Sequence, residues 1–219
     1  MEYASKLIER IKADPENPRV GVLSNELLRE FQLGYPIDEL RLLLKSDDEN
    51  LVEIAIWLVS KLGRESQPLL ADVVHLLASP VKKIKFFALD SLLWTRPEDG
   101  CNLAQAFELL DDPDSGVRWK TLDLLYRLSR EQLEAVYTCS RPGTTLAAAH
   151  REGVRWLLSA DSLSPDKISD AVVNSDPTVR KFGVVAAARL QKQNPQPLVS
   201  ASTSADGDLR DFANGLLPS

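Results

Sequence analysis

The sequence predicts an all-α protein, an α-solenoid of about six to seven helix-pair repeats, and two observations carry this prediction. Segments of similar pattern recur about every 31–33 residues, which is a period typical of repeat proteins. Within them, apolar residues recur at steps of three and four, as on one face of an α-helix, whereas strand-like alternation is missing. One helix pair cannot cover its own apolar face, so the pairs are expected to stack into a single domain, residues 1–219.

The repeat shows best in the second helix of each pair, which follows a polar or proline-containing turn. We call the first apolar residue after that turn the anchor. Successive anchors are 31, 33, 33, 29, 33 and 30 residues apart: Val20, Leu51, Ile84, Val117, Leu146, Val179 and Leu209. The first helices of the pairs are predicted at residues 1–13, 36–45, 66–78, 101–110, 130–139 and 164–173.

Several residues mark where these helices begin. Asp176 followed by Pro177 is typical of an N-cap and a first-turn proline. Ser129 and Gln132 have the spacing of a capping box, in which each side chain bonds the other residue's backbone N–H. Pro165 occupies a position that suits the first turn of a helix.

Composition excludes several classes of protein and limits the kinds of partner. Hydrophobic residues make up 44% and charged residues 26%, which excludes a disordered chain, a collagen and a disulfide-dense mini-protein. The net charge is −6, and residues 1–73 carry 14 acidic but 9 basic side chains. We therefore expect a protein partner with a basic surface. The chain has no basic stripe, so nucleic acid is an unlikely partner.

The chain shows no membrane or export signal. Its longest apolar run, residues 54–59, is far shorter than a membrane span, and the N-terminus lacks the apolar stretch of a signal peptide. We expect a cytoplasmic protein without membrane contact.

No catalytic or metal-binding motif is present. Cys101 and Cys139 lack CxxC spacing and are expected to be reduced thiols, and neither His75 nor His150 lies in a motif. Phosphate-binding loops and nucleophile elbows are missing. We therefore expect no metal, no cofactor and no enzymatic activity.

Two turns resemble a known repeat family. Asp176, Pro177, Val179, Arg180 and Gly183 resemble HEAT-like repeats of the short bacterial type, and a looser match lies at residues 112–121. This resemblance implies that the second helices line a concave face. It also implies that the arginine after each anchor pairs with a turn aspartate in a ladder along the stack, a role that would fall to Arg118, Arg180 and Arg210.

Side chains two and six residues after the anchors are predicted to share the concave face. In the three middle repeats these residues are aromatic rings interleaved with carboxylates: Glu53, Trp57, Phe86, Asp90, Trp119 and Asp123. Such a surface suits a basic, partly apolar protein. The alternative is that the rings belong to the core and the carboxylates to a solvated face. Trp94 and Trp156, ten residues after their anchors, are expected to cover the core.

The favoured function is a non-enzymatic protein-binding scaffold, an adaptor or a regulatory subunit. An immunity-type inhibitor of a basic toxin or nuclease is an alternative. A further one comes from resemblance to HEAT-like alkylpurine DNA glycosylases, which hold a damaged nucleotide with Trp and Asp side chains, as Trp119 and Asp123 could. The acidic chain departs from that pattern. HEAT-like phycobilin lyases are a weaker alternative, since no tetrapyrrole pocket is marked.

Overall fold

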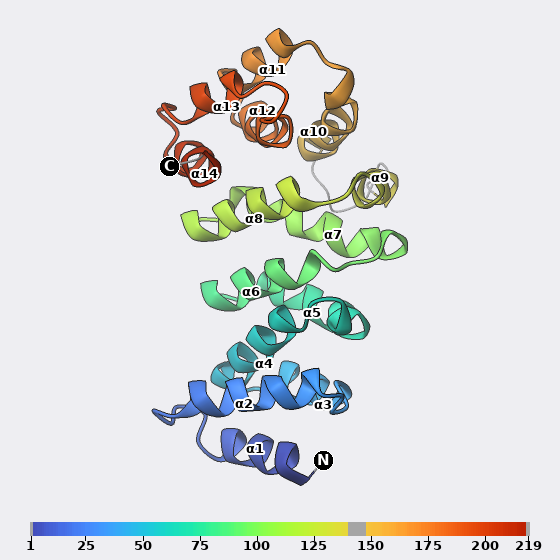
Figure 1. The fold of residues 1–219 in the computed structure, drawn as a ribbon, viewed down its shortest axis with the longest axis vertical. Coiled ribbons are helices and arrows are strands. Elements are labelled where there is room, and N and C mark those ends of the chain that lie inside the picture. Colours follow the sequence, from blue (N-terminus) through green and yellow to red (C-terminus); the bar gives the residue numbers. More distant parts are fainter. Residues whose placement is uncertain (1, 140–147, 218–219) are drawn as a thin grey trace. The chain divides into compact units, whose positions relative to one another are not determined.

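The computed structural model describes residues 2–139 and 148–217. These residues form helices joined by turns, and no strand is found among them. They divide into two compact units, Met1–Thr95 and Arg96–Ser219. Within each unit, first helices (A helices) pack against second helices (B helices), as Figure 1 shows. The prediction of an all-α solenoid is confirmed.

In the first unit the B helices pack on one another in chain order. α2 contacts α4, and α4 contacts α6. The B helices are α2 (Val20–Gln32), α4 (Glu49–Leu62) and α6 (Lys82–Leu92). The first two A helices are α1 (Glu2–Ala13) and α3 (Asp38–Leu44). The third A position holds three consecutive short elements: η1 (Gly63–Leu69), α5 (Leu70–Val73) and η2 (Val74–Ala78). The last A segment is partly 3₁₀ helix, and Pro68 lies inside it, where the missing N–H prevents a regular α-helix.

The second unit continues the pairs. Its B helices are α8 (Ser115–Arg127), α10 (Ala148–Ser159), α12 (Pro177–Arg189) and α14 (Gly207–Leu216). Its A positions hold η3 (Pro97–Asp99), α7 (Gly100–Ala106) and η4 (Phe107–Asp111), then α9 (Arg130–Cys139), α11 (Pro165–Val172) and α13 (Gln196–Ala201), with η5 (Ala160–Ser162) after α10. Helix α13 is absent from the predicted set, because its segment is short and rich in proline.

An aspartate in the turn begins four of the B helices. The side chains of Asp48, Asp114, Asp176 and Asp206 accept hydrogen bonds from backbone N–H groups in the first turn of α4, α8, α12 and α14. Each bond satisfies a donor that the helix itself leaves unpaired. The predicted cap at residue 176 is confirmed. So is the capping box, since the backbone N–H of Ser129 donates to Gln132 Oε1 and that of Gln132 to Ser129 Oγ.

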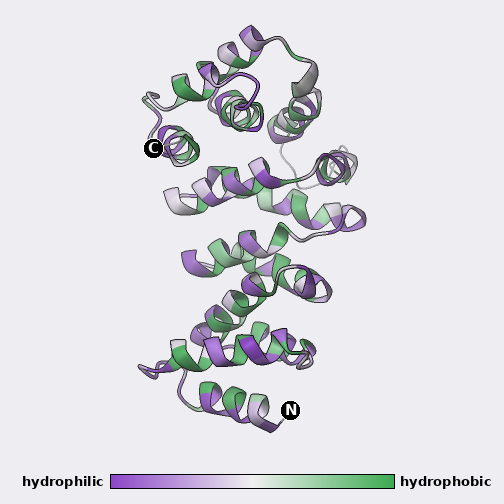
Figure 2. Cartoon of the chain, in the orientation of Figure 1, coloured by the Kyte–Doolittle hydropathy of each residue, from purple (hydrophilic) through white to green (hydrophobic). Residues whose placement is uncertain are grey.

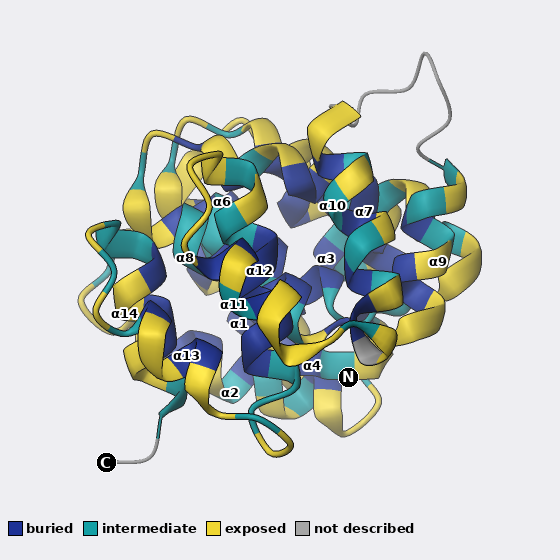
Figure 3. Ribbon diagram, turned by 90° about the horizontal axis from the view of Figure 1, so that it is seen from above, coloured by how far each residue is buried: buried dark blue, intermediate teal, exposed yellow. Residues whose placement is uncertain are grey.

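The core follows the apolar faces of the helices. Figure 2 shows apolar and polar residues on different sides of several helices, and Figure 3 shows buried residues on the sides where helices pack. Four anchors are fully or almost fully buried: Leu51, Ile84, Val117 and Leu209. Val20 is half-buried, and Val179 is 39% exposed. The anchor Leu146 lies outside the described residues.

Packing in the second unit departs from simple chain order. Helix α12 contacts α8, α10, α11, α13 and α14, and α8 also contacts α14. The interior of α12 is accordingly buried from Phe182 to Ala188, and apolar or small residues occupy all its sides, as in a central helix. Lys181 fastens it to the α8 repeat by donating to the Leu110 carbonyl (2.7 Å) and to Asp111 Oδ1 (2.6 Å). Arg189 donates to two carbonyls at the end of α8.

The arginines after the anchors mainly bind turn carbonyls. Arg118 donates to the Asp112 and Pro113 carbonyls, Arg180 to those of residues 174 and 175, and Arg210 to the Ser204 carbonyl. Each arginine therefore ties the turn to its own helix. Arg180 also lies 3.7 Å from Asp206 in the next turn, which is a single step of the implied ladder. Arg118 instead pairs with Asp208 of α14.

The expectation of two reduced thiols was wrong. Cys101 in α7 and Cys139 at the end of α9 form a disulfide, with Cα atoms 5.3 Å apart. Their sequence separation of 38 residues gives no local signal of pairing. The contact arises because α7 and α9 are neighbouring A helices that pack side by side.

Candidate functional site

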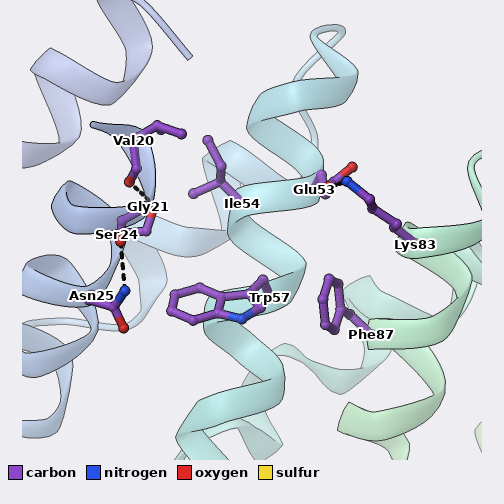
Figure 4. A pocket seen from close by; sticks show the side chains of 9 residues that line it. All are labelled: Val20, Gly21, Ser24, Asn25, Glu53, Ile54, Trp57, Lys83 and Phe87. Carbon is purple, nitrogen blue, oxygen red and sulfur yellow. Dashed lines mark hydrogen bonds and ion pairs between the residues drawn. The ribbon is translucent and has the colours of Figure 1, made fainter. Parts of the chain in front are cut away.

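A pocket lies between the B helices of the first unit. It has a volume of ≈ 250 Å³ and is lined by residues of α2, α4 and α6 (Figure 4). Two of the six predicted site residues, Glu53 and Trp57, take part in it. The other lining residues are Val20, Gly21, Ser24, Asn25, Ile54, Lys83 and Phe87.

Apolar side chains form most of this pocket. Trp57 and Ile54 project from α4 toward α2, and Phe87 of α6 stands on the other side of Trp57 (Figure 4). Trp57 and Phe87 are half-buried, so their rings contribute both to packing and to an accessible surface. The α2 side is small or polar, because it presents Gly21 and Asn25, both exposed.

One ion pair borders the pocket. Lys83 Nζ of α6 lies 3.0 Å from Glu53 Oε1 of α4, and the two side chains are 65% and 30% exposed. On the α2 side, the Asn25 amide donates to the Gly21 carbonyl at 2.7 Å. The border therefore holds charges of both signs, and hydrogen-bonding groups at the edge of an apolar site fix the orientation of a ligand.

Phe86 and Asp90 do not line this pocket. The Phe86 ring meets the Phe87 ring edge-on, with centroids 5.9 Å apart. Asp90 lies 4.0 Å from Lys61 of α4. Both residues are half-buried, and their role in partner binding stays a prediction.

In the second unit, Trp119 and Asp123 of α8 have intramolecular partners. The Trp119 ring meets the Phe212 ring of α14 at a centroid distance of 6.2 Å. Asp123 forms ion pairs with Lys120 (3.0 Å) and Arg127 (3.5 Å) of its own helix. Both residues are half-buried, and these contacts fit the packing interpretation of the pair. Their binding role also stays a prediction.

Sequence reasoning missed most of the pocket. Ile54 and Phe87 each stand three residues after an anchor, whereas the predicted face used the second and sixth positions. Lys83 precedes its anchor by one residue, so it lies outside the positions that were used to predict the concave face. The third position could have been found by asking which apolar residues of the B helices stay half-buried.

The remaining candidates for chemistry in residues 2–139 and 148–217 are metal-ligating and titratable side chains. No group of three His, Cys, Asp or Glu side chains there is placed to hold a metal ion. His150 of α10 is 3% exposed, and its Nε2 lies 3.2 Å from Asp111 Oδ2. Burial lowers the pKa of His150, although Asp111 opposes this shift. No described helix is long and apolar enough to cross a membrane.

Comparison with known proteins identifies the architecture. No family model matches the chain, and no curated protein matches it. Among solved structures, a designed armadillo repeat protein in complex with the peptide (KR)4 is similar over 98% of this chain and 96% of that chain, with 13% identity and a TM-score of 0.54. An engineered protein from a structural-genomics consortium is similar over 96% of this chain and 66% of that chain, with 13% identity and a TM-score of 0.51. The chain is a helical repeat protein with an α-solenoid fold.

Proposed function

We propose that the chain is a non-enzymatic protein-binding scaffold, and that the pocket of α2, α4 and α6 holds a segment of its partner. The observation that carries this proposal is the accessible apolar pocket around Trp57 and Phe87. A helical repeat fold does not by itself determine a function, so the function is argued from such a site. A structure with the same fold binds a peptide, which supports a protein or peptide as the general kind of partner.

The pocket favours an apolar side chain over a small polar ligand. Binding energy in protein interfaces concentrates in aromatic residues that occupy well-packed pockets, and Trp57 with Phe87 offers such a surface. The Glu53–Lys83 pair is solvent-accessible, so it is worth little to folding and is available to hydrogen-bond a partner backbone. A partner with a basic surface remains part of the proposal, because the chain carries a net charge of −6.

No observation favours the immunity-type inhibitor, the alkylpurine glycosylase or the phycobilin lyase, so none of them is proposed. The glycosylase hypothesis used Asp123 as a carboxylate that stabilises a developing positive charge. That carboxylate already faces two cations of its own helix, Lys120 and Arg127. In its finer form, the proposal is that the scaffold acts as an adaptor or a regulatory subunit and that it is located in the cytoplasm.

A pocket-filling variant tests the proposal. Gly21 lines the pocket, and a Cβ added there meets no other atom within 4 Å, so Gly21→Leu introduces an apolar side chain at the pocket without a clash at its Cβ. Leucine also raises helix propensity by about 0.8 kcal/mol relative to glycine, so the variant should not lose stability. Gln32→Leu is the matched control, since Gln32 is exposed near the end of α2 and does not line the pocket.

The assay is selection of a random peptide display library on the wild-type chain. Affinities of the selected peptides are then measured by calorimetry. We expect peptides with one large apolar residue to bind the wild type and the Gln32→Leu variant equally, and to bind the Gly21→Leu variant at least tenfold more weakly. Equal binding to all three proteins would place the peptide site elsewhere. Failure to select any binding peptide on the folded wild type would contradict the scaffold proposal.

A further inference from the structure

A second pocket lies wholly within the second unit, between α10 and the beginning of α12. Its volume is ≈ 330 Å³. Trp156 and Ala149 line it from α10, and Val179 and Phe182 line it from α12. Trp156 was expected to cover the core, but the structure places it half-buried at an accessible pocket instead.

Small residues on α10 keep this pocket open. Ala149 is exposed, and nothing larger than its methyl group extends from that position. At Gly153 a Cβ would collide with the Phe182 ring, so the ring lies directly on the α10 backbone. The space beside the ring is therefore unfilled.

The anchor of α12 shows that apolar surface is left uncovered here. Val179 is 39% exposed, whereas Leu51, Ile84 and Val117 at the same repeat position are 9%, 2% and 1% exposed. These three repeats bury the anchor. Val179 instead exposes its side chain to solvent at the edge of the pocket.

The charged residues that line this pocket are all acidic. Glu152 and Asp176 line it, and no lysine, arginine or histidine belongs to its lining. Glu152 pairs with Arg155 of its own helix, but the two side chains are 61% and 62% exposed, and a pair so exposed is easily exchanged for another cation. Asp176 is an exposed N-cap residue. The first pocket differs, because Lys83 stands at its border.

We propose that this second pocket binds an apolar side chain flanked by lysine or arginine in a segment of a partner protein. The inference rests on the proposed function and adds the chemistry of the segment. Small-molecule sites commonly occupy about 300–1,000 Å³, so this pocket lies at the lower end, where one large side chain fits. Trp156, Val179 and Phe182 receive the apolar group, and the carboxylates of Glu152 and Asp176 attract the flanking cations.

The experiment uses acetylated tripeptide amides as probes of the full-length chain. Lys-Phe-Lys, Lys-Ala-Lys and Glu-Phe-Glu are titrated separately into ¹⁵N-labelled protein, and the indole N–H signals of Trp156 and Trp57 are followed by NMR. We expect Lys-Phe-Lys to shift the Trp156 signal in a saturable way. The other two peptides should bind at that signal at least fivefold more weakly, because each lacks the ring or the cations.

Two adjacent alanines provide the variant and its control. Ala149→Leu fills the pocket from an exposed position, and Ala148→Leu adds the same side chain at an exposed position that does not line the pocket. We expect the first to weaken Lys-Phe-Lys binding at Trp156 at least tenfold and the second to leave it within twofold, with thermal unfolding showing that both fold.

The outcomes separate this inference from the proposed function. A silent Trp156 signal overturns the second site, and a shift of the Trp57 signal in the same titration would still support the first pocket. Equal binding of Lys-Phe-Lys and Glu-Phe-Glu overturns the charge selection. Equal binding by the Ala149→Leu and Ala148→Leu variants shows that the peptide binds elsewhere and overturns the assignment to this pocket.

Discussion

Replacing Gly183 with alanine tests the closest helix contact of the second unit. Helix α12 lies so near α11 that a Cβ at Gly183 would stand 2.7 Å from the Ala171 carbonyl carbon and 2.9 Å from its oxygen. These are backbone atoms of a helix, so they cannot rotate away as a flexible side chain does. Overpacking of this kind destabilises by about 1–3 kcal/mol, and a backbone clash belongs at the upper end of that range.

The net effect is smaller than the clash alone. Alanine is favoured over glycine inside a helix by about 1 kcal/mol, so Gly183→Ala should lower the free energy of unfolding by about 2 kcal/mol. Gly21→Ala is the matched control, because its Cβ meets nothing within 4 Å, and it should raise stability by up to about 1 kcal/mol. The two variants should therefore change the free energy of unfolding in opposite directions.

Urea denaturation followed by far-UV circular dichroism measures both variants. Adding Ala171→Gly should restore only part of the loss in Gly183→Ala, since it removes the Cβ contact at 2.9 Å and leaves the backbone contact. A Gly183→Ala variant as stable as the wild type would refute the close approach of α11 and α12.

Two further predictions concern the covalent and acid stability of the second unit. The Cys101–Cys139 bond closes a loop with a separation of 38 residues. By the loop-entropy relation, a Cys101→Ala/Cys139→Ala variant should therefore lose about 4 kcal/mol of the free energy of unfolding, measured by urea denaturation. Two free thiols, titrated in native protein that was purified without reductant, would contradict the bond. Burial lowers the pKa of His150 in the fold below its unfolded value of about 6.5, so stability is fully present above that pH and falls as the pH drops toward the native pKa. An NMR titration in which His150 protonates at or above the unfolded value of about 6.5 would contradict this sign.

The B helices were predictable because their signal is local. In four of the B helices, an aspartate in the turn, an anchor three residues later and apolar residues at helical spacing all lie within one segment, as at Asp176 and Asp206. The A helices carry weaker signals. Pro68 interrupts one of them, and α13 has too few residues for a periodic pattern to appear.

Contacts between distant repeats were not predictable in the same way. Nothing in a single segment indicates that α12 packs on α8. Lys181 of α12, for example, hydrogen-bonds Leu110 and Asp111, which lie about 70 residues away in the sequence. The disulfide escaped prediction for a similar reason: two cysteines 38 residues apart meet only if their helices are neighbours. Most of the first pocket was missed, partly because the predicted face used only the second and sixth positions after each anchor.

Both pockets arise from one arrangement of side chains. In each, small residues of one B helix face large apolar residues of the next: Gly21 faces the α4 side with Trp57, and Ala149 faces the α12 side with Val179. Larger residues would raise helix propensity at Gly21 and would bury more apolar surface at both positions. Stability alone therefore favours filling these spaces. Proteins often keep residues that are not optimal for stability, so only the measured effect of these substitutions separates a binding role from a structural one. Gly21→Leu and Ala149→Leu should therefore weaken peptide binding and leave the protein at least as stable as the wild type. If these positions had a purely structural role, the same substitutions would lower stability instead.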